Sequence, residues 1–78
     1  MIINTVKFII SNHLHASEYK IHADTQFLKD LNADSLDILE VVMAVEAEFN
    51  IEIDSRDIGK IKTVGDLCKC ISALTGLV

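Results

Sequence analysis

The sequence predicts an all-α fold, in which three main helices and one short helix form a bundle and a long loop follows the first helix. Apolar residues recur at intervals of three and four in four separate segments, which is the period of an amphipathic helix. Half of the 78 residues are apolar, enough for the core of one domain spanning residues 1–78. The chain has no proline, and all three glycines follow residue 58.

The first helix is predicted over residues 3–14. Its apolar stripe consists of Ile3, Val6, Phe8, Ile9, Ile10 and Leu14. Residues 16–33 are too polar and irregular for one helix, so they are expected to form the long loop. Phe27, Leu28 and Leu31 are expected to anchor this loop to the core.

The second helix, residues 35–49, has the clearest pattern. Asp34 is a good N-cap, and Asp37 and Glu40 lie near the positive end of the helix. The stripe expected to face the core contains Ile38, Val41, Val42, Val45 and Phe49. A second, offset stripe contains Leu36, Leu39, Met43 and Ala47, flanked by Glu40, Glu46 and Glu48. Exposed apolar residues inside an acidic fringe are typical of a docking face.

A short third helix is predicted over residues 55–60, with Gly59 near its end. Thr63 and Asp66 have the spacing of a capping box, so a fourth helix is expected to begin there and run to about residue 74. Its inward-facing residues are expected to be Val64, Leu67, Cys68, Ile71 and Leu74. Gly76 follows the predicted end of this helix.

The negative charge of the chain is concentrated in one segment. Residues 30–57 carry nine acids and one base, a net charge of −8, whereas the remainder carries three acids and six bases. A concentrated acidic field disfavours nucleic acid and anionic membranes and favours partners with basic patches. The sequence has no stretch expected to insert stably into a membrane and no signal-peptide pattern. Cys68 and Cys70 resemble small apolar residues of a reducing compartment, so a cytoplasmic location, or a similar reducing lumen, is expected.

Calcium binding is the first alternative for the segment around Ser35. Asp30, Asn32 and Asp34 match the opening of an EF-hand loop. The sixth position of that loop should be glycine but is Ser35, and the twelfth should be glutamate but is Val41. No metal site is therefore expected.

Nucleophilic catalysis is the second alternative. It needs a base and an oxyanion hole around the hydroxyl. His13, His15 and His22 lie in the first helix or the loop, and no G-x-S-x-G elbow occurs. The sequence therefore predicts no catalytic residue and no enzyme.

A capping role is the third alternative for Ser35, because serine is common at helix starts. Asp34 already supplies a cap, which leaves the Ser35 hydroxyl free to face solvent. A phosphate attached there would lie beside unpaired N–H groups at the positive end of the helix. The residues alone favour a modified serine, carrying a phosphate or a larger group.

The segment resembles the acyl carrier proteins. Asp34-Ser35-Leu36 matches the Asp-Ser-Leu attachment motif of that family. Residues 37–53 are similar to its second helix and the exit from that helix, and residues 60–66 to the entry of its last helix. Agreement is close over residues 25–71 and loose over the first two dozen residues.

The resemblance implies a type II carrier in which a phosphopantetheinyl transferase esterifies Ser35 with 4′-phosphopantetheine from coenzyme A. The thiol of this arm would hold acyl chains as thioesters for fatty acid synthesis. Alternatives are a carrier for a polyketide, aminoacyl or lipid A-type pathway, and an interaction module that never uses the arm. The implied partners are fatty acid synthase enzymes and acyltransferases with basic patches, and the chain is expected to act as a monomer.

The resemblance also implies the site residues. Asp34 and Leu36 flank the attachment serine. The partner-binding residues are Asp37, Leu39, Glu40, Met43, Glu46, Ala47, Glu48 and Arg56. Ile53 and Ile61 flank the entrance for the acyl chain.

The sequence departs from the family pattern at several positions. Asn32 stands where the family usually has glycine, and asparagine tolerates the positive φ that glycine would supply. Asp54 replaces the usual proline before the third helix, and Ser55 and Arg56 occupy positions that are often acidic. Gly59 should loosen that helix further. These departures bear on which partners bind, because they lie at the end of the docking face.

Overall fold

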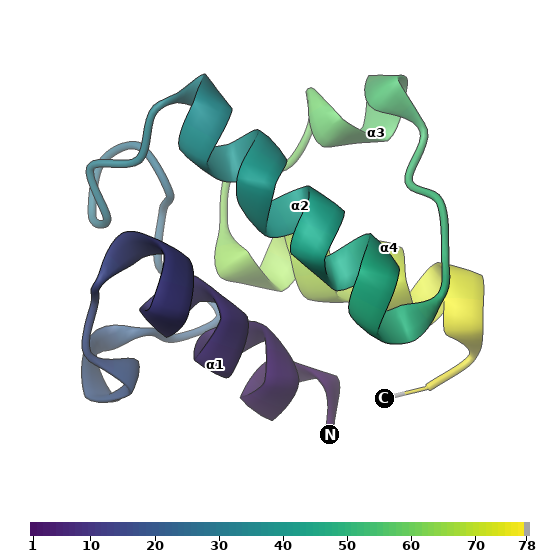
Figure 1. Ribbon diagram of the computed structural model, residues 1–78, viewed down its shortest axis with the longest axis horizontal. Coiled ribbons are helices and arrows are strands. Elements are labelled where there is room, and N and C mark those ends of the chain that lie inside the picture. Colours follow the sequence, from purple (N-terminus) through teal and green to yellow (C-terminus); the bar gives the residue numbers. More distant parts are fainter. Residues whose placement is uncertain (78) are drawn as a thin grey trace.

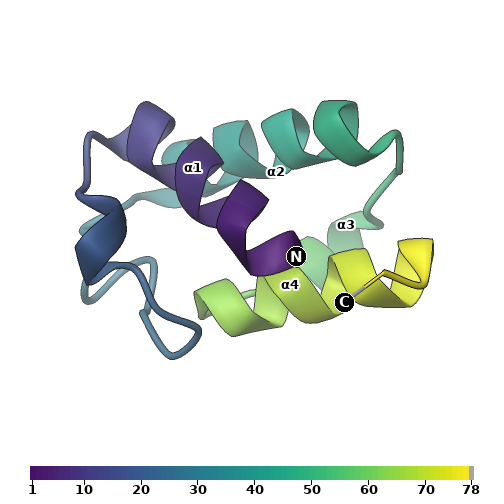
Figure 2. The ribbon, with the colours of Figure 1, turned by 90° about the horizontal axis from the view of Figure 1, so that it is seen from below.

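The computed structural model describes residues 1–77, and its helices confirm the all-α prediction. In chain order they are α1 (Ile2–Leu14), the 3-10 helix η1 (Glu18–Lys20), α2 (Ser35–Phe49), α3 (Ser55–Ile58) and α4 (Val64–Thr75). α1 packs against both α2 and α4 (Figures 1 and 2). In Figure 2, α2 and α4 lie on opposite sides of the molecule with α1 between them.

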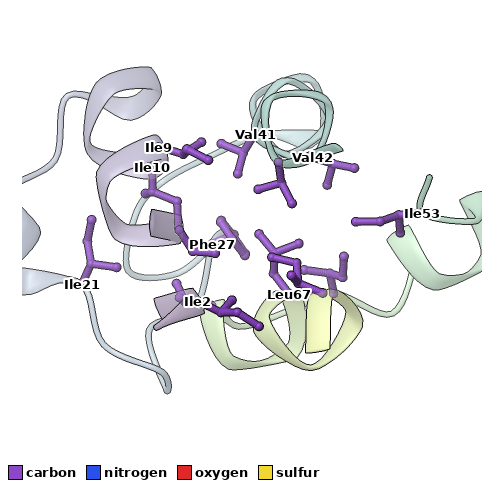
Figure 3. Close-up of a cluster of buried hydrophobic side chains, with 14 of the residues drawn as sticks. Ile2, Ile9, Ile10, Ile21, Phe27, Val41, Val42, Ile53 and Leu67 are labelled. Atoms are coloured by element: carbon purple, nitrogen blue, oxygen red, sulfur yellow. The ribbon is translucent and has the colours of Figure 1, made fainter. Parts of the chain in front are cut away.

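The core is one cluster of mainly aliphatic side chains, drawn in part in Figure 3. Its fully buried members are Val6, Ile10, Ile21, Phe27, Val41, Val42, Val45, Val64, Leu67 and Ile71. They come from α1, the long loop, α2 and α4. The apolar spacing therefore identifies most of the inward-facing residues of the three main helices, because residues three and four apart share one face of a helix.

One helix end and one additional element differ from the sequence predictions. α3 ends at Ile58, two residues before the predicted end, because Gly59 and Lys60 continue only as turns. Glycine has little preference for the helical conformation, which favours this early end. The loop contains η1, which was not expected, and the Ser17 side chain caps it by accepting a hydrogen bond from the N–H of Tyr19.

Three side chains predicted to face inward are exposed. Phe8 projects away from the core because it lies two residues, or roughly 200° around the helix, from the buried Val6. Leu28 is 67% exposed, since its neighbour Phe27 takes the buried position of that turn. Leu74 lies in the last turn of α4, beside the exposed Ala73. The predicted anchors Phe27 and Leu31 do pack against the core.

The long loop is tied to the start of α4. The N–H of Val64 donates to the carbonyl of Thr25 at 2.9 Å, and the N–H of Gly65 donates to that of Ala23 at 2.7 Å. A Cβ atom at Gly65 would lie 2.9 Å from the Ala23 oxygen, so this close approach requires glycine. The loop therefore lies against the segment that enters α4.

Candidate functional site

Asp34 and Asp37 form a capping box at the start of α2. The Asp34 carboxylate accepts a 2.9 Å hydrogen bond from the N–H of Asp37, and the Asp37 carboxylate accepts one of 3.1 Å from the N–H of Asp34. This confirms that Asp34 is the N-cap. Each carboxylate accepts a hydrogen bond from the backbone N–H of the other aspartate, and neither bonds to the hydroxyl of Ser35 between them.

Ser35 is the first residue of α2, and its side chain is exposed. Within residues 1–77 its hydroxyl makes no hydrogen bond, as expected from the cap that Asp34 supplies. The first N–H groups of a helix have no partner inside it, and those of Ser35 and Leu36 have none elsewhere in the described chain. An exposed oxygen therefore stands beside two free donors at the positive end of α2.

The chain reaches this position through a left-handed residue. Asn32 has a φ of 53°, which confirms that it supplies the conformation glycine would give. The following Ala33 is buried, and its N–H donates to the carbonyl of Phe27 at 2.9 Å. This link fixes the start of α2 relative to the loop.

A mainly apolar cavity of about 490 Å³ begins beside Ser35. Its lining consists of Gln26, Phe27, Leu28, Ser35, Ile38, Ile58, Gly59, Ile61 and Lys62. The volume is within the range of small-molecule sites in proteins. Ile61 lies on this lining, whereas Ile53 lines a different pocket with Glu46. Both side chains are buried in the core.

The second apolar stripe of α2 is exposed, as the sequence predicts. Leu36 is 68% and Met43 59% exposed, and Leu39 and Ala47 also lie on the surface. The side chains of Glu40 and Glu48 are exposed and make no hydrogen bond within residues 1–77. The surface of α2 therefore presents apolar groups among free carboxylates.

Glu46 is placed differently from these two acids. It is half-buried, and its carboxylate accepts a 2.7 Å hydrogen bond from the N–H of Ile53. The bond connects α2 to the segment that leads into α3. No local sequence signal indicates it, because the partners are seven residues apart and belong to different elements.

Arg56 pairs with Asp54 at the start of α3. The guanidinium lies 3.2 Å from the carboxylate, which also accepts a 2.8 Å hydrogen bond from the N–H of Arg56. These bonds lower the pKa of Asp54. Because the Arg56 side chain is 86% exposed, the pair is a weak one and its cation remains accessible.

The lining of the cavity includes four residues that no sequence pattern marks as site residues, namely Gln26, Ile58, Gly59 and Lys62. They come from the long loop, from the end of α3 and from the segment between α3 and α4. The antiparallel bridge between Gln26 and Thr63 and the backbone hydrogen bonds beside it bring the loop and this segment together. A single sequence shows no sign of such a pairing.

Within residues 1–77, no three His, Cys, Asp or Glu residues come together as metal ligands. His13, His15 and His22 are exposed, and burial raises the pKa of Cys68 and Cys70. In the same part of the chain, no helix has the length and apolar character needed to cross a bilayer.

The chain is similar to known proteins over almost its whole length. A family described as "Phosphopantetheine attachment site" matches residues 4–71. Among solved structures, a protein from Mycobacterium tuberculosis that has been assigned as an acyl carrier protein is 30% identical in sequence. The match covers 94% of this chain and 97% of that chain, with a TM-score of 0.88.

Proposed function

The chain belongs to the acyl carrier proteins with a phosphopantetheine attachment site, and from this premise we propose that Ser35 bears the arm of a type II carrier for fatty acid synthesis. As a member of this family, the protein binds 4′-phosphopantetheine and is a carrier, not an enzyme. The attachment residue, the pathway and the action of residues 1–78 as a single carrier domain are our proposals.

The free hydroxyl of Ser35 is the observation that carries the proposal. A transferase can reach this oxygen, and no neighbour in residues 1–77 has to release it. The unpaired N–H groups of Ser35 and Leu36 favour a negatively charged phosphodiester at this position. These residues therefore fit the group that the family carries.

Attachment would transfer phosphopantetheine from coenzyme A to Ser35. The hydroxyl oxygen forms a bond to the phosphorus that bears pantetheine, while the bond from that phosphorus to the bridging pyrophosphate oxygen breaks. The hydroxyl proton passes to a base of the transferase, and adenosine 3′,5′-bisphosphate leaves. The bound arm supplies a terminal thiol that holds acyl groups as thioesters.

The cavity beside Ser35 supports a role with alkyl chains. Phe27, Ile38 and Ile58 give it a mainly apolar lining, which favours hydrocarbon over water. Ile61 lies on the same lining, consistent with the proposed entrance for the acyl chain. An apolar chain in this cavity would be removed from solvent while the carrier moves between enzymes.

The acidic face of α2 supports the proposed partners. Carrier proteins of this family interact with transferases and synthases. Here we propose a phosphopantetheinyl transferase and fatty acid synthase enzymes and acyltransferases with basic patches, recognised by Glu40, Glu48 and the apolar Met43. Complementary charge speeds the encounter and permits easy release, which suits a carrier with many partners. We further propose that the protein acts as a cytoplasmic monomer.

Intact-mass measurement after incubation with coenzyme A and a transferase tests the attachment residue. We expect the wild-type chain to gain the mass of one arm and Ser35→Ala to gain none. Ser55→Ala is a matched control, because Ser55 also begins a helix directly after an aspartate N-cap. The proposal is wrong if Ser35→Ala is loaded, or if the wild-type chain never is.

The pathway needs a separate measurement on the loaded chain. A carrier for fatty acid synthesis accepts a malonyl group from a malonyl transferase, whereas an aminoacyl carrier is loaded by an adenylating enzyme. We expect the first reaction. Loading only by an adenylating enzyme would instead support the specialised carrier.

A further inference from the structure

Lys62 lines the same cavity as Ser35. Of the described residues that form this lining, it is the only one with a charged side chain. The others are apolar or neutral, Gln26 among them. A single cation therefore stands at a cavity whose edge carries the proposed attachment oxygen.

The backbone of Lys62 is fixed on both sides. Its carbonyl accepts a 3.0 Å hydrogen bond from the N–H of Phe27, and its N–H donates to the carboxylate of Asp66 at 3.0 Å. The neighbouring Thr63 pairs with Gln26 across the antiparallel bridge. The position from which the lysine side chain projects is therefore defined by the fold, although the side chain itself is exposed.

The acids bonded to this segment are engaged by backbone donors. The Asp66 carboxylate accepts the N–H groups of both Lys62 and Thr63, and the Asp30 carboxylate accepts that of Gln26. Within residues 1–77 the ammonium of Lys62 forms no ion pair. It is thus a free cation in a chain with an overall charge of −5.

We infer that Lys62 is a positioning residue, whose ammonium pairs with the phosphodiester attached to Ser35 and directs the arm toward the cavity. The inference rests on the proposed function, because it needs a phosphate at Ser35. The carboxylates of Asp34 and Asp37 repel that phosphate, whereas the ammonium attracts it. When the phosphodiester lies beside Lys62, the arm that it bears is directed toward the cavity and away from the acidic face of α2.

Phosphorus NMR of the loaded chain without an acyl group tests this pairing. We expect Lys62→Met to change the ³¹P chemical shift and Lys62→Arg, which keeps the cation, to restore it. Lys60→Met is the matched control, since Lys60 loses the same charge two residues away but lines a different pocket. If Lys62→Met leaves the ³¹P signal unchanged, or Lys60→Met changes it equally, the inference is wrong.

The rate at which hydroxylamine cleaves an octanoyl thioester on the arm provides a second readout. We expect Lys62→Met to raise it by about two- to five-fold, the factor corresponding to one exposed ion pair, and Lys60→Met to leave it unchanged. An effect on cleavage without any ³¹P change would mean that Lys62 contacts the acyl group, and would overturn the pairing with phosphate. Absence of the arm in the mass spectrum overturns the proposed function and this inference together, whereas a loaded chain with an unchanged ³¹P signal overturns the inference alone.

Discussion

The carboxylate of Glu46 accepts a 2.7 Å hydrogen bond from the backbone N–H of Ile53. Glu46 belongs to α2, and Ile53 precedes α3 with its side chain buried in the core. The bond therefore holds the connection between the two helices in place. Partner binding by Glu46 stays a prediction from the sequence, and one oxygen of its carboxylate is engaged within the chain.

Glu46→Ala should destabilise the fold. Removing the carboxylate leaves the N–H of Ile53 without its partner in a partly buried position, at a cost of about 1–2 kcal/mol. Glu48→Ala removes an exposed acid from the same helix and should change the free energy of unfolding by less than about 0.5 kcal/mol. Urea denaturation measures both values. Equal effects of the two variants would contradict a structural role for Glu46.

Glu40→Lys should slow the transfer of acyl groups to partner enzymes with basic patches. Glu40 is exposed and makes no hydrogen bond in the described chain, so reversing its charge alters the encounter without disturbing the fold. We expect a rate lower by about three- to ten-fold at low salt, with a smaller difference at high salt. Unchanged circular dichroism is the control. An unchanged transfer rate would remove Glu40 from the docking face.

Salt should raise the melting temperature of the protein. The nine acids of residues 30–57 repel one another, and dissolved ions screen this repulsion. Dissolved ions also weaken the attraction between Arg56 and Asp54, but this ion pair is exposed and contributes little to the stability of the fold. Calorimetry at increasing sodium chloride and magnesium chloride measures the effect. A melting temperature that falls or stays constant would mean that repulsion among these acids is negligible.

Gly65→Ala should destabilise the fold by about 1–3 kcal/mol, the usual cost of overpacking. The new Cβ would lie 2.9 Å from the backbone oxygen of Ala23, which cannot move away without disturbing the loop. Gly59→Ala is the control. It has a negative φ, and the nearest atom to its Cβ is at 3.6 Å, so this change should be neutral or slightly stabilising. Similar losses from both variants would contradict the close approach at Gly65.

Asp66 should contribute stability that depends on pH. Hydrogen bonds from the N–H groups of Lys62 and Thr63 lower the pKa of Asp66 from its ordinary value of 3.8. Because the pKa of Asp66 is lower in the folded chain than in the unfolded chain, where it is about 4, the ionised carboxylate stabilises the fold at pH values above about 4. This contribution is lost as the pH falls through the folded-state pKa. The melting temperature of Asp66→Asn should therefore be lower than that of wild type at pH 6, with a smaller difference near pH 2. A constant difference would exclude a contribution from ionisation.

Local patterns in the sequence determined the helices, their caps and the free hydroxyl. Asp34 and Thr63 begin α2 and α4 as predicted, because capping depends on residues only three positions apart. The buried and exposed stripes of α2 also follow from spacing alone. The same local rules failed for Leu28 and Leu74, whose exposure depends on what packs over them.

Tertiary structure alone decided which residues meet around Ser35. The cavity joins side chains from the loop, α2, the end of α3 and the segment before α4. Lys62 belongs to it because the loop pairs with that segment. In the same way, the carboxylate of Glu46 accepts a hydrogen bond from an N–H group seven residues away. Hydrogen bonds between separate elements depend on how the helices pack, and that information is spread over the whole chain rather than held in any short motif.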